Sequence, residues 1–350
     1  MTLAPDSTSV TEAALRTLTY PRLRYMGSKY KLAPHLANVL TEIGGTTALD
    51  AFSGSGVVSY LMKGMGYEVT SNDFMNFPTA IATATTVNSS VKLTANDIAT
   101  ICGPAADRRN FIQTKFDGLY FTPDDRRFLD SAWSHVDTLT GNKRAMAISA
   151  LVLSAARRQP RGVFTFTDAT KYNDGRRDLT MSLREHFQEH AVAYNRAVFS
   201  NGLKHKALTG DVFDLPTGYD VVYLDPPYAP PRDDADYMKR YHFLEGLSVY
   251  WRGQEIMEET ATKKIAKKFT PFAYKRTVVE AMRNLFKHFH ESTIVLSYSS
   301  NAVPDSETIV SLLREVKAEV EVIPIAHTYS FGTHEAATRR SASEYIFVAR

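Results

Sequence analysis

The sequence predicts an α/β fold, built on a mostly parallel sheet of about seven strands and interrupted by a mainly helical insertion. Short apolar runs alternate with helical patterns near both ends of the chain, as in proteins whose parallel strands are joined by helices. Between residues 78 and 205 this alternation lapses and helical periodicity dominates. The apolar run 219–224 ends at Asp225-Pro226-Pro227-Tyr228, because proline cannot donate a hydrogen bond to a neighbouring strand. Ligands bind at such strand ends in open α/β sheets, so we expect the functional site there.

The composition is that of a globular protein with a sizeable core. The chain has 350 residues, 44% of them hydrophobic and 11% aromatic, enough for one large domain or a catalytic domain with an insertion. Cys102 is the single cysteine, which excludes an internal disulfide, and we interpret it as structural. No apolar run approaches the ~18 residues of a membrane span and the N-terminus lacks a signal pattern, so we expect a cytoplasmic protein without a membrane partner. The net charge of +3 argues only weakly for a polyanionic partner, so local basic clusters are more informative.

The N-terminal residues lead into a first candidate binding element. Residues 1–20 show little periodicity, and we expect a frayed or loosely docked arm. Next, Gly27 and Ser28 allow a tight turn into a helix that continues through Leu36 and Leu40. Tyr25 and Lys29 would flank this turn, offering a stacking face and a cation for a carboxylate. The alternative is an ordinary helix start with solvated lysines.

A glycine loop follows the first predicted strand. Residues 46–52 form that strand, which runs into Ser53-Gly54-Ser55-Gly56 and a helix from Val57 through Met62. The loop lacks the third glycine of the dinucleotide fingerprint, so it fits S-adenosylmethionine, which has no pyrophosphate, better than NAD. A plain turn between strand and helix is the alternative. The next strand, 67–73, ends at Asp73, about twenty residues past the loop, where a ribose-binding carboxylate lies in such folds. Asn-Asp alone would indicate only a turn.

Basic residues gather in two regions. The segment 78–205 predicts helices near 124–137, 143–157 and 179–199 and a β-hairpin at 162–177, in which Phe164, Phe166 and Tyr172 alternate with cations. A second basic stretch, 263–276, also contains aromatic residues. Both patterns indicate contact with nucleic acid, with solvated helix faces as the alternative. The candidate DNA contacts are Arg158, Arg161, Lys171, Arg176, Lys267, Lys268 and Lys275.

The remaining strands complete the sheet. The run 206–211 is a strand that ends near Asp211, which could face the adenine amino group of a cofactor or form a turn. We expect residues 229–250 to form a loop near the pocket. Further strands are predicted at 292–301, 320–325 and 344–348, the last two as a hairpin-like pair with the Arg-rich loop 338–340 between them.

The Asp-Pro-Pro-Tyr segment suits a flat heterocycle that carries an amino group. Asp225 and the carbonyl of Pro226 can each accept one amino hydrogen, while Tyr228 stacks on the ring. The amino nitrogen of adenine or cytosine is a poor nucleophile because its lone pair is delocalised into the ring. Two acceptors that draw it toward tetrahedral geometry would therefore help it attack. The alternative is a strand stopped by proline with a tyrosine on the surface.

These motifs, in this order, resemble the Dam-like DNA adenine methyltransferases of the alpha motif order. Residues 25–29 resemble the family's N-terminal cofactor motif, with Ser28 in place of its second glycine. Residues 52–56 resemble the loop that cradles methionine, Asp73 the ribose-binding acid, and Asp225 to Tyr228 the catalytic motif. The resemblance implies a Rossmann-like methyltransferase fold, the cofactor S-adenosyl-L-methionine and a target-recognition insertion.

Together, the patterns and the resemblance predict an N-terminal arm (1–20), a catalytic domain (21–77 and 206–350) and a DNA-binding insertion (78–205). We expect methyl transfer to the 6-amino group of a flipped adenine in double-stranded DNA by a monomer, with a cognate restriction endonuclease encoded nearby and no metal. The alternatives are the 4-amino group of cytosine, RNA, a protein glutamine amide (for which Asn would be favoured over Asp225), or a catalytically silent DNA-binding module. The expected catalytic residues are Asp225, Pro226 and Tyr228. The expected cofactor-binding residues are Tyr25, Gly27, Lys29, Asp50, Phe52, Gly54, Gly56, Asp73, Asp211 and Asp225.

Overall fold

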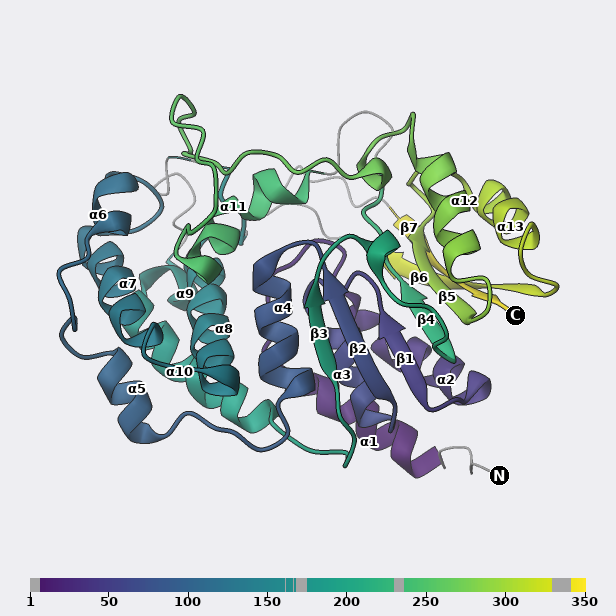
Figure 1. The fold of residues 1–350 in the computed structure, drawn as a ribbon, viewed down its shortest axis with the longest axis horizontal. Helices are drawn as coiled ribbons and strands as arrows, with labels where there is room; N and C mark the ends of the chain where they lie inside the picture. Colours follow the sequence, from purple (N-terminus) through teal and green to yellow (C-terminus); the bar gives the residue numbers. More distant parts are fainter. Residues whose placement is uncertain (1–6, 161, 166, 168–174, 230–235, 329–340) are drawn as a thin grey trace.

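The computed structural model describes residues 7–160, 162–165, 167, 175–229, 236–328 and 341–350 (Figure 1). Its described strands form one sheet of seven in the order β3-β2-β1-β4-β5-β7-β6. Strands β1 to β5 pair with one another in parallel, and β7 is antiparallel to both β5 and β6. This arrangement confirms the predicted Rossmann-like α/β class and the predicted hairpin-like final pair. The strands are β1 (Thr47–Asp50), β2 (Glu68–Asp73), β3 (Lys206–Thr209), β4 (Val221–Leu224), β5 (Thr293–Ser299), β6 (Val320–Thr328) and β7 (Ser341–Ala349).

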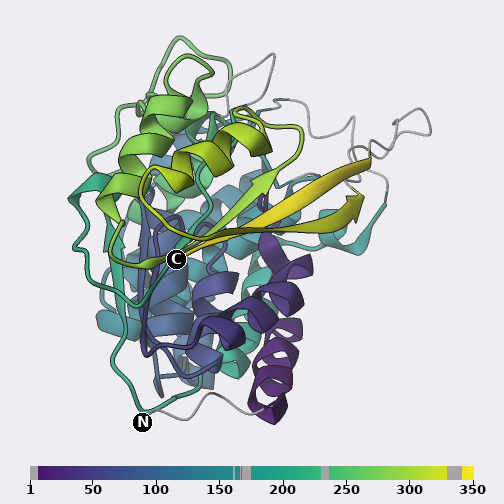
Figure 2. The same cartoon turned by 90° about the vertical axis from the view of Figure 1, so that its right-hand side faces the viewer.

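The two faces of the sheet pack into two separate cores. Successive side chains of a strand point to opposite faces, so Val221 joins one core and Val222 the other. Helices α2 (Ala33–Ile43) and α3 (Val57–Gly64) belong to the first core, and α12 (Val278–His288) and α13 (Ser306–Arg314) to the second. Figure 2 shows the two groups of helices on opposite sides of the sheet. Both faces are therefore covered, which explains why β4 is apolar throughout.

The expected loose N-terminal arm is wrong for residues 7–20. Residues Ser7–Leu18 form helix α1, which packs against α2 and α3. Ala13 and Thr17, one helical turn apart, are both buried, and the Cβ of Ala13 would lie 3.2 Å from a Cβ added to Gly64. The sequence does not predict this packing, because small and polar residues, rather than large apolar ones, make the contact.

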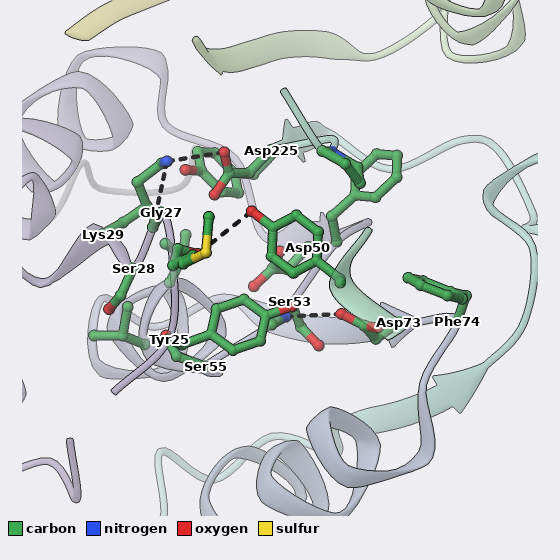
Figure 3. Close-up of a pocket in the computed structure, with 18 residues that line it drawn as sticks. Tyr25, Gly27, Ser28, Lys29, Asp50, Ser53, Ser55, Asp73, Phe74 and Asp225 are labelled. Carbon is green, nitrogen blue, oxygen red and sulfur yellow. Dashed lines mark hydrogen bonds and ion pairs between the residues drawn. The ribbon is translucent and has the colours of Figure 1, made fainter. Parts of the chain in front are cut away.

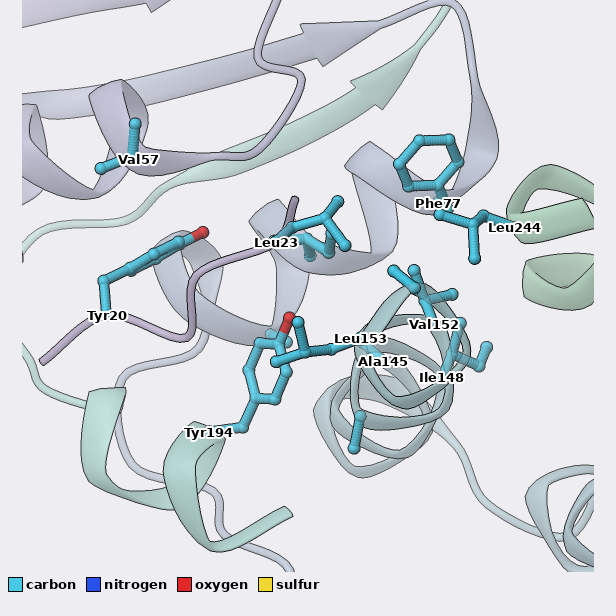
Figure 4. Packing of buried hydrophobic residues seen from close by; sticks show 14 of the residues in the cluster. Tyr20, Leu23, Val57, Phe77, Ala145, Ile148, Val152, Leu153, Tyr194 and Leu244 are labelled. Atoms are coloured by element: carbon cyan, nitrogen blue, oxygen red, sulfur yellow. The ribbon is translucent and has the colours of Figure 1, made fainter. Parts of the chain in front are cut away.

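The helical segment, residues 78–205, packs on the β3 edge of the sheet (Figure 1). Its helices α7, α8 and α10 confirm the three helices that the sequence predicts. Helix α8 packs against α4, α10 and helix α11, which spans Tyr237–Val249. Figure 4 shows Ile148 and Val152 of α8 with Phe77 of α4 and Leu244 of α11, all members of the first core. The predicted boundary after residue 77 therefore falls inside α4. The helices are α4 (Asn76–Ala82), α5 (Ala95–Ile101), α6 (Phe111–Lys115), α7 (Pro123–Val136), α8 (Gly141–Arg158), α9 (Arg177–Thr180) and α10 (Leu183–Ala197).

The expected loop over 229–250 is wrong for its second half. Helix α11 (Tyr237–Val249) begins after Asp236, whose side chain accepts a hydrogen bond from the backbone of Lys239. Its residue Glu245 is buried and accepts hydrogen bonds from the backbone and side chain of Asn76 at the start of α4. Tertiary burial, which local sequence does not encode, thus stabilises this helix.

Some predictions fall outside the described residues. These are the centre of the hairpin at 173–174 and the loop 338–340, while the described residues 162–165 form no strand. None of the helices in the described ranges has the length and apolar character needed to cross a membrane.

Candidate active site

A pocket lies at the carboxyl ends of β1, β2 and β4 (Figure 3). Parallel strands end at one edge of a sheet, so loops that are far apart in sequence meet there. The pocket brings together most of the residues predicted to bind the cofactor, namely Tyr25, Gly27, Lys29, Asp50, Phe52, Gly54, Asp73 and Asp225. Pro226, Tyr228, Gly56 and Asp211 do not line it.

The glycine loop and the end of β2 are tied together by Asp73. The backbone N–H of Gly54 donates to Oδ2 of Asp73 at 2.9 Å, and the N–H of Met75 donates to Oδ1 at 3.0 Å. Burial raises the pKa of Asp73 to about 7, although these backbone hydrogen bonds act to lower it. A buried carboxylate that keeps spare lone pairs is suited to further hydroxyl donors from a ligand.

Asp50 presents an oxygen that has no protein partner. Its side chain is 1% exposed, and Oδ2 accepts hydrogen bonds from the N–H of Ser59 at 3.0 Å and from its hydroxyl at 2.6 Å. Oδ1 has no hydrogen-bond partner among the described residues. Burial raises the pKa of Asp50 to about 7. A buried acceptor left unpaired costs free energy, so this position favours a ligand that donates, above all a cationic one.

Lys29 and Asp225 meet in a buried ionic cluster. The ammonium of Lys29 lies 2.9 Å from Oδ1 of Asp225 and 3.0 Å from Oε1 of Glu344, and it donates to the carbonyl of Gly27 at 2.9 Å. Burial lowers the pKa of Lys29, but the two carboxylates outweigh this effect, so the pKa is raised overall. The alternative of a solvated lysine is therefore wrong for Lys29, which is 3% exposed.

The two oxygens of Asp225 have different surroundings. Oδ1 accepts from the hydroxyl of Tyr228 at 2.9 Å and faces Lys29, whereas Oδ2 has no hydrogen bond or ion pair within the described part of the chain. The side chain is 17% exposed, toward the pocket it lines. Burial raises the pKa of Asp225 to about 6, against the opposing effect of Lys29. One oxygen is thus held by the protein and the other is open to a donor.

Asp211 lies in an adjoining pocket, which shares Phe52, Phe74 and Pro227 with the first. Its Oδ1 accepts from the N–H of Phe213 at 3.0 Å, so part of the side chain stabilises a short 3₁₀ turn. The alternative interpretation of Asp211 as a turn residue is therefore correct for that oxygen. Its place beside two aromatic rings is compatible with a flat ligand.

Sequence reasoning missed an aromatic wall and an acid. Tyr241 of α11 stacks on Tyr25, with ring centroids 4.8 Å apart, and Tyr237 lies 5.5 Å from Tyr25. Glu344 of β7 contacts Lys29 and Tyr228. The signal for Glu344 was present as an acid directly before the apolar run Tyr-Ile-Phe-Val, inside a strand. Tyr237 and Tyr241 carried no such signal because their segment was interpreted as a loop.

The glycine loop has little room for side chains. Gly54 has φ +46°, and an added Cβ would lie 2.8 Å from Cε1 of Tyr25. Gly56 has φ +77°, and an added Cβ would lie 2.6 Å from the hydroxyl of Tyr20. Gly56 thus serves the packing of the loop rather than the lining of the pocket.

Gly54→Ala should destabilise the protein by roughly 1–3 kcal/mol, since it combines a left-handed backbone with a clash against the stacked ring of Tyr25. Chemical denaturation would measure this free energy of unfolding. Gly118→Ala is the matched control, because Gly118 also has positive φ (+72°) but no atom within 4 Å of its added Cβ. Equal losses in the two variants would show that the ring of Tyr25 does not restrict the loop.

The predicted DNA contacts are distributed unevenly. Arg158 is 20% exposed, donates to the carbonyl of Leu179 and lies 3.6 Å from Asp125, so its guanidinium has structural partners. Lys267 lies 3.5 Å from Asp236 and 4.8 Å from the ring centre of Tyr274. Arg176, Lys268 and Lys275 are exposed, and Arg161 and Lys171 lie outside the described residues.

No group of His, Cys, Asp and Glu in the described ranges is arranged to hold a metal ion.

Comparisons with known proteins agree with this geometry. Residues 25–301 match the D12 class N6 adenine-specific DNA methyltransferase family. The chain is 28% identical to the type II methyltransferase M2.HphI of Haemophilus parahaemolyticus, over 94% of this chain and 97% of that protein. It is 23% identical to the type II methyltransferase M.CviAII of Paramecium bursaria Chlorella virus 1, over 93% and 98%. The modification methylase StsI of Streptococcus sanguinis is 24% identical, over 85% of this chain but 47% of that protein. No solved structure matches the chain.

The family match runs from Tyr25 to Asn301 and so includes the glycine loop, Asp73 and the Asp225–Tyr228 segment. The chain therefore belongs to the D12 class N6 adenine-specific DNA methyltransferases, the enzymes of site-specific adenine methylation in DNA.

Proposed function

We propose that the pocket binds S-adenosyl-L-methionine and that the chain methylates the 6-amino group of an adenine flipped out of double-stranded DNA. The observation that carries this proposal is a pair of carboxylate oxygens without protein partners in the described residues, Oδ1 of Asp50 and Oδ2 of Asp225. Both side chains line the same pocket, at the ends of the neighbouring strands β1 and β4. One oxygen can accept from the cofactor and the other from the substrate.

The residues around the pocket fit this cofactor. The unpaired, buried Oδ1 of Asp50 suits the ammonium of its methionine part. Asp73 suits the ribose hydroxyls, and the adjoining pocket, with Asp211, Phe52 and Phe74, suits the adenine ring. When bound, S-adenosyl-L-methionine supplies the methyl group, which it carries on a sulfonium. The proposed contact between Lys29 and the cofactor carboxylate remains a prediction, since the described contacts of this ammonium are within the protein.

The Asp225–Tyr228 segment would act on the target base. Oδ2 of Asp225 and the carbonyl of Pro226 accept the two amino hydrogens, which draws the nitrogen toward the geometry it needs for attack. Tyr228 stacks on the flipped ring and also holds Oδ1 of Asp225 through its hydroxyl. Flipping costs a few kcal/mol, while holding the reactants in near-attack geometry can contribute about 7–11 kcal/mol. Positioning by these residues would thus supply much of the rate.

We also propose that DNA contacts the exposed cations of the chain, with the helical segment 78–205 acting in target recognition. Phe269, 69% exposed, stacks on Tyr274 with ring centroids 5.5 Å apart, and Lys268 and Lys275 are exposed nearby in sequence. We propose in addition that the enzyme is a cytoplasmic monomer. The names of the relatives as type II and modification enzymes support a restriction endonuclease as companion.

The double variant Lys268→Glu/Lys275→Glu should bind DNA more weakly. If each lysine contacts one phosphate, the slope of log K against log salt concentration should fall in magnitude by about 1.8, at about 0.9 per phosphate on duplex DNA. Fluorescence anisotropy over a salt series would measure it. Lys204→Glu/Lys206→Glu is the matched control, because these exposed lysines lie at the opposite, amino end of the sheet. An equal loss of DNA affinity in both double variants would show that net charge, rather than contact at Lys268 and Lys275, causes the effect.

The direct test of the proposed function is transfer of a labelled methyl group from S-adenosyl-L-methionine to mixed-sequence duplex DNA, followed by nucleoside digestion and mass analysis. We expect N6-methyl-2′-deoxyadenosine as the labelled nucleoside. Label in 2′-deoxycytidine, or label transferred to an RNA substrate but not to DNA, would overturn the proposal.

A further inference from the structure

Glu344 is a buried acid on a strand that otherwise packs into the core. It is 1% exposed, and Ile346 and Val348, which follow it at alternate positions of β7, belong to the first core. A carboxylate is rarely buried in this way unless charged or donating groups compensate it. Two of the compensating groups, Lys29 and Tyr228, belong to the active site.

Glu344 shares its partners with Asp225. Oε1 of Glu344 lies 3.0 Å from the ammonium of Lys29 and accepts from the hydroxyl of Tyr228 at 2.6 Å. The same two donors each lie 2.9 Å from Oδ1 of Asp225. One cation and one hydroxyl are thus held between two carboxylates, which arrive from the end of β4 and from β7. The ammonium of Lys29 also lies 4.8 Å from the ring centre of Tyr228, which fixes that ring against the pair.

This sharing changes the acceptor strength of Asp225. A lysine committed to Asp225 alone would withdraw electron density from the carboxylate and weaken its hydrogen bond to an amino group. A second carboxylate on the far side of the ammonium takes part of that charge and adds a negative neighbour. The pKa of Asp225 agrees with this account, since burial raises it, Lys29 lowers it and Glu344 raises it again.

We propose that Glu344 is a positioning residue for methyl transfer: by sharing Lys29 and Tyr228 with Asp225, it keeps Asp225 a strong acceptor and leaves Oδ2 open to the target amino group. This inference rests on the proposed function of the site, and it assigns a role to a residue outside the Asp-Pro-Pro-Tyr motif. Other ionisable groups also face Asp225, but they are common to the variants compared below. They are Tyr25, Asp50, Tyr223 and Tyr237.

The test compares two neutralising variants, Glu344→Gln and Lys29→Gln, through the pH dependence of kcat at saturating cofactor and DNA. Protonated Asp225 cannot accept an amino hydrogen at Oδ2 as the carboxylate does, so kcat should fall on the acid side as Asp225 gains a proton. Glu344→Gln should move this acid limb to lower pH by about one unit, because one neighbouring negative charge is removed. It should also lower the plateau of kcat about three- to tenfold with little change in KM for DNA, since the carboxylate becomes a weaker acceptor. Lys29→Gln should move the limb in the opposite direction.

Shifts of the acid limb in opposite directions in the two variants would indicate an electrostatic role. A simple loss of structure would lower kcat without moving the acid limb along the pH axis. Glu321→Gln, on the exposed side of neighbouring β6, is the matched control and should leave kcat and the limb unchanged. An unmoved acid limb in folded Glu344→Gln, with or without a loss of kcat, would overturn the inference. If Glu344→Gln does not fold, Lys29→Gln against Lys29→Gln/Glu344→Gln measures the same contribution, and equal limbs in that pair would overturn it too. Absence of methyl transfer by the unmodified protein would instead overturn the proposed function.

Discussion

Asp225→Asn should abolish methyl transfer while leaving cofactor binding nearly unchanged. Lys29 and Tyr228 both donate to the Oδ1 position, so they would orient the amide oxygen there and place the amide NH₂ at the open Oδ2 position. The target amino group would then meet a donor where it needs an acceptor. We expect kcat to fall by at least about 10³-fold, in the range found when a group that acts directly in the transition state is removed.

Single-turnover methyl transfer and calorimetric binding of S-adenosyl-L-methionine would measure the two effects separately. Asp214→Asn is a suitable control. Asp214 is exposed, lies in the connection between β3 and β4, and has no described side-chain hydrogen bond or ion pair. Asp225→Asn itself is expected to melt at no lower a temperature than the unmodified protein, because Lys29 keeps Glu344 as its ionic partner. Turnover within tenfold of normal would refute the assignment of Asp225.

Asp50→Asn should weaken cofactor binding and stabilise the free protein at neutral pH. Its amide oxygen can keep the hydrogen bonds from Ser59, which places the NH₂ group at the unpaired Oδ1 position. Loss of a hydrogen bond between a carboxylate and a cation is worth about 1.5–3 kcal/mol, or roughly 10- to 150-fold in the dissociation constant. The same substitution removes a buried, uncompensated charge, so stability should change in the opposite direction from binding.

The pH dependence of that stabilisation follows from the pKa of Asp50. The folded-state pKa is raised to about 7, above that of the unfolded chain near 4. The unfolded chain therefore ionises first, and the destabilisation by Asp50 is absent below about pH 4 and grows as the pH rises toward 7. Asp50→Asn should raise the melting temperature at pH 8 by more than at pH 5.

Asp220→Asn provides a contrast at the other end of the same strands. Its carboxylate accepts from the backbone of Thr46 and Thr47, and these hydrogen bonds lower its pKa. That variant should therefore lower the melting temperature at neutral pH and leave cofactor binding intact. An increase in melting temperature on Asp50→Asn that is the same at pH 5 and pH 8, or unchanged cofactor affinity, would contradict the proposed role of Asp50.

The sequence by itself determined the fold class and predicted a site at the carboxyl ends of the strands, with its central residues. The glycine loop, Asp73 and the Asp225–Tyr228 segment each lie in a few adjacent residues at a predicted strand end. Parallel strands necessarily bring such ends to one edge of a sheet, so local patterns were sufficient to predict that these segments meet. The helices near 124–137, 143–157 and 179–199 were also predictable, because their periodicity extends over several turns.

Only the tertiary structure decided which side chains are partners. Lys29 and Glu344 come from opposite ends of the chain, and their contact depends on β7 lying beside β5. Helix α1 likewise forms where small or polar residues meet a complementary surface, and α11 where large apolar residues and Glu245 become buried, which their own sequences do not reveal. Arg158 was predicted to contact DNA because it lies in a basic stretch of sequence, but its guanidinium contacts Asp125 and the carbonyl of Leu179. The physical reason is common to all of these cases: the energy of a buried charge or a packed helix depends on groups that the chain brings close only when it folds.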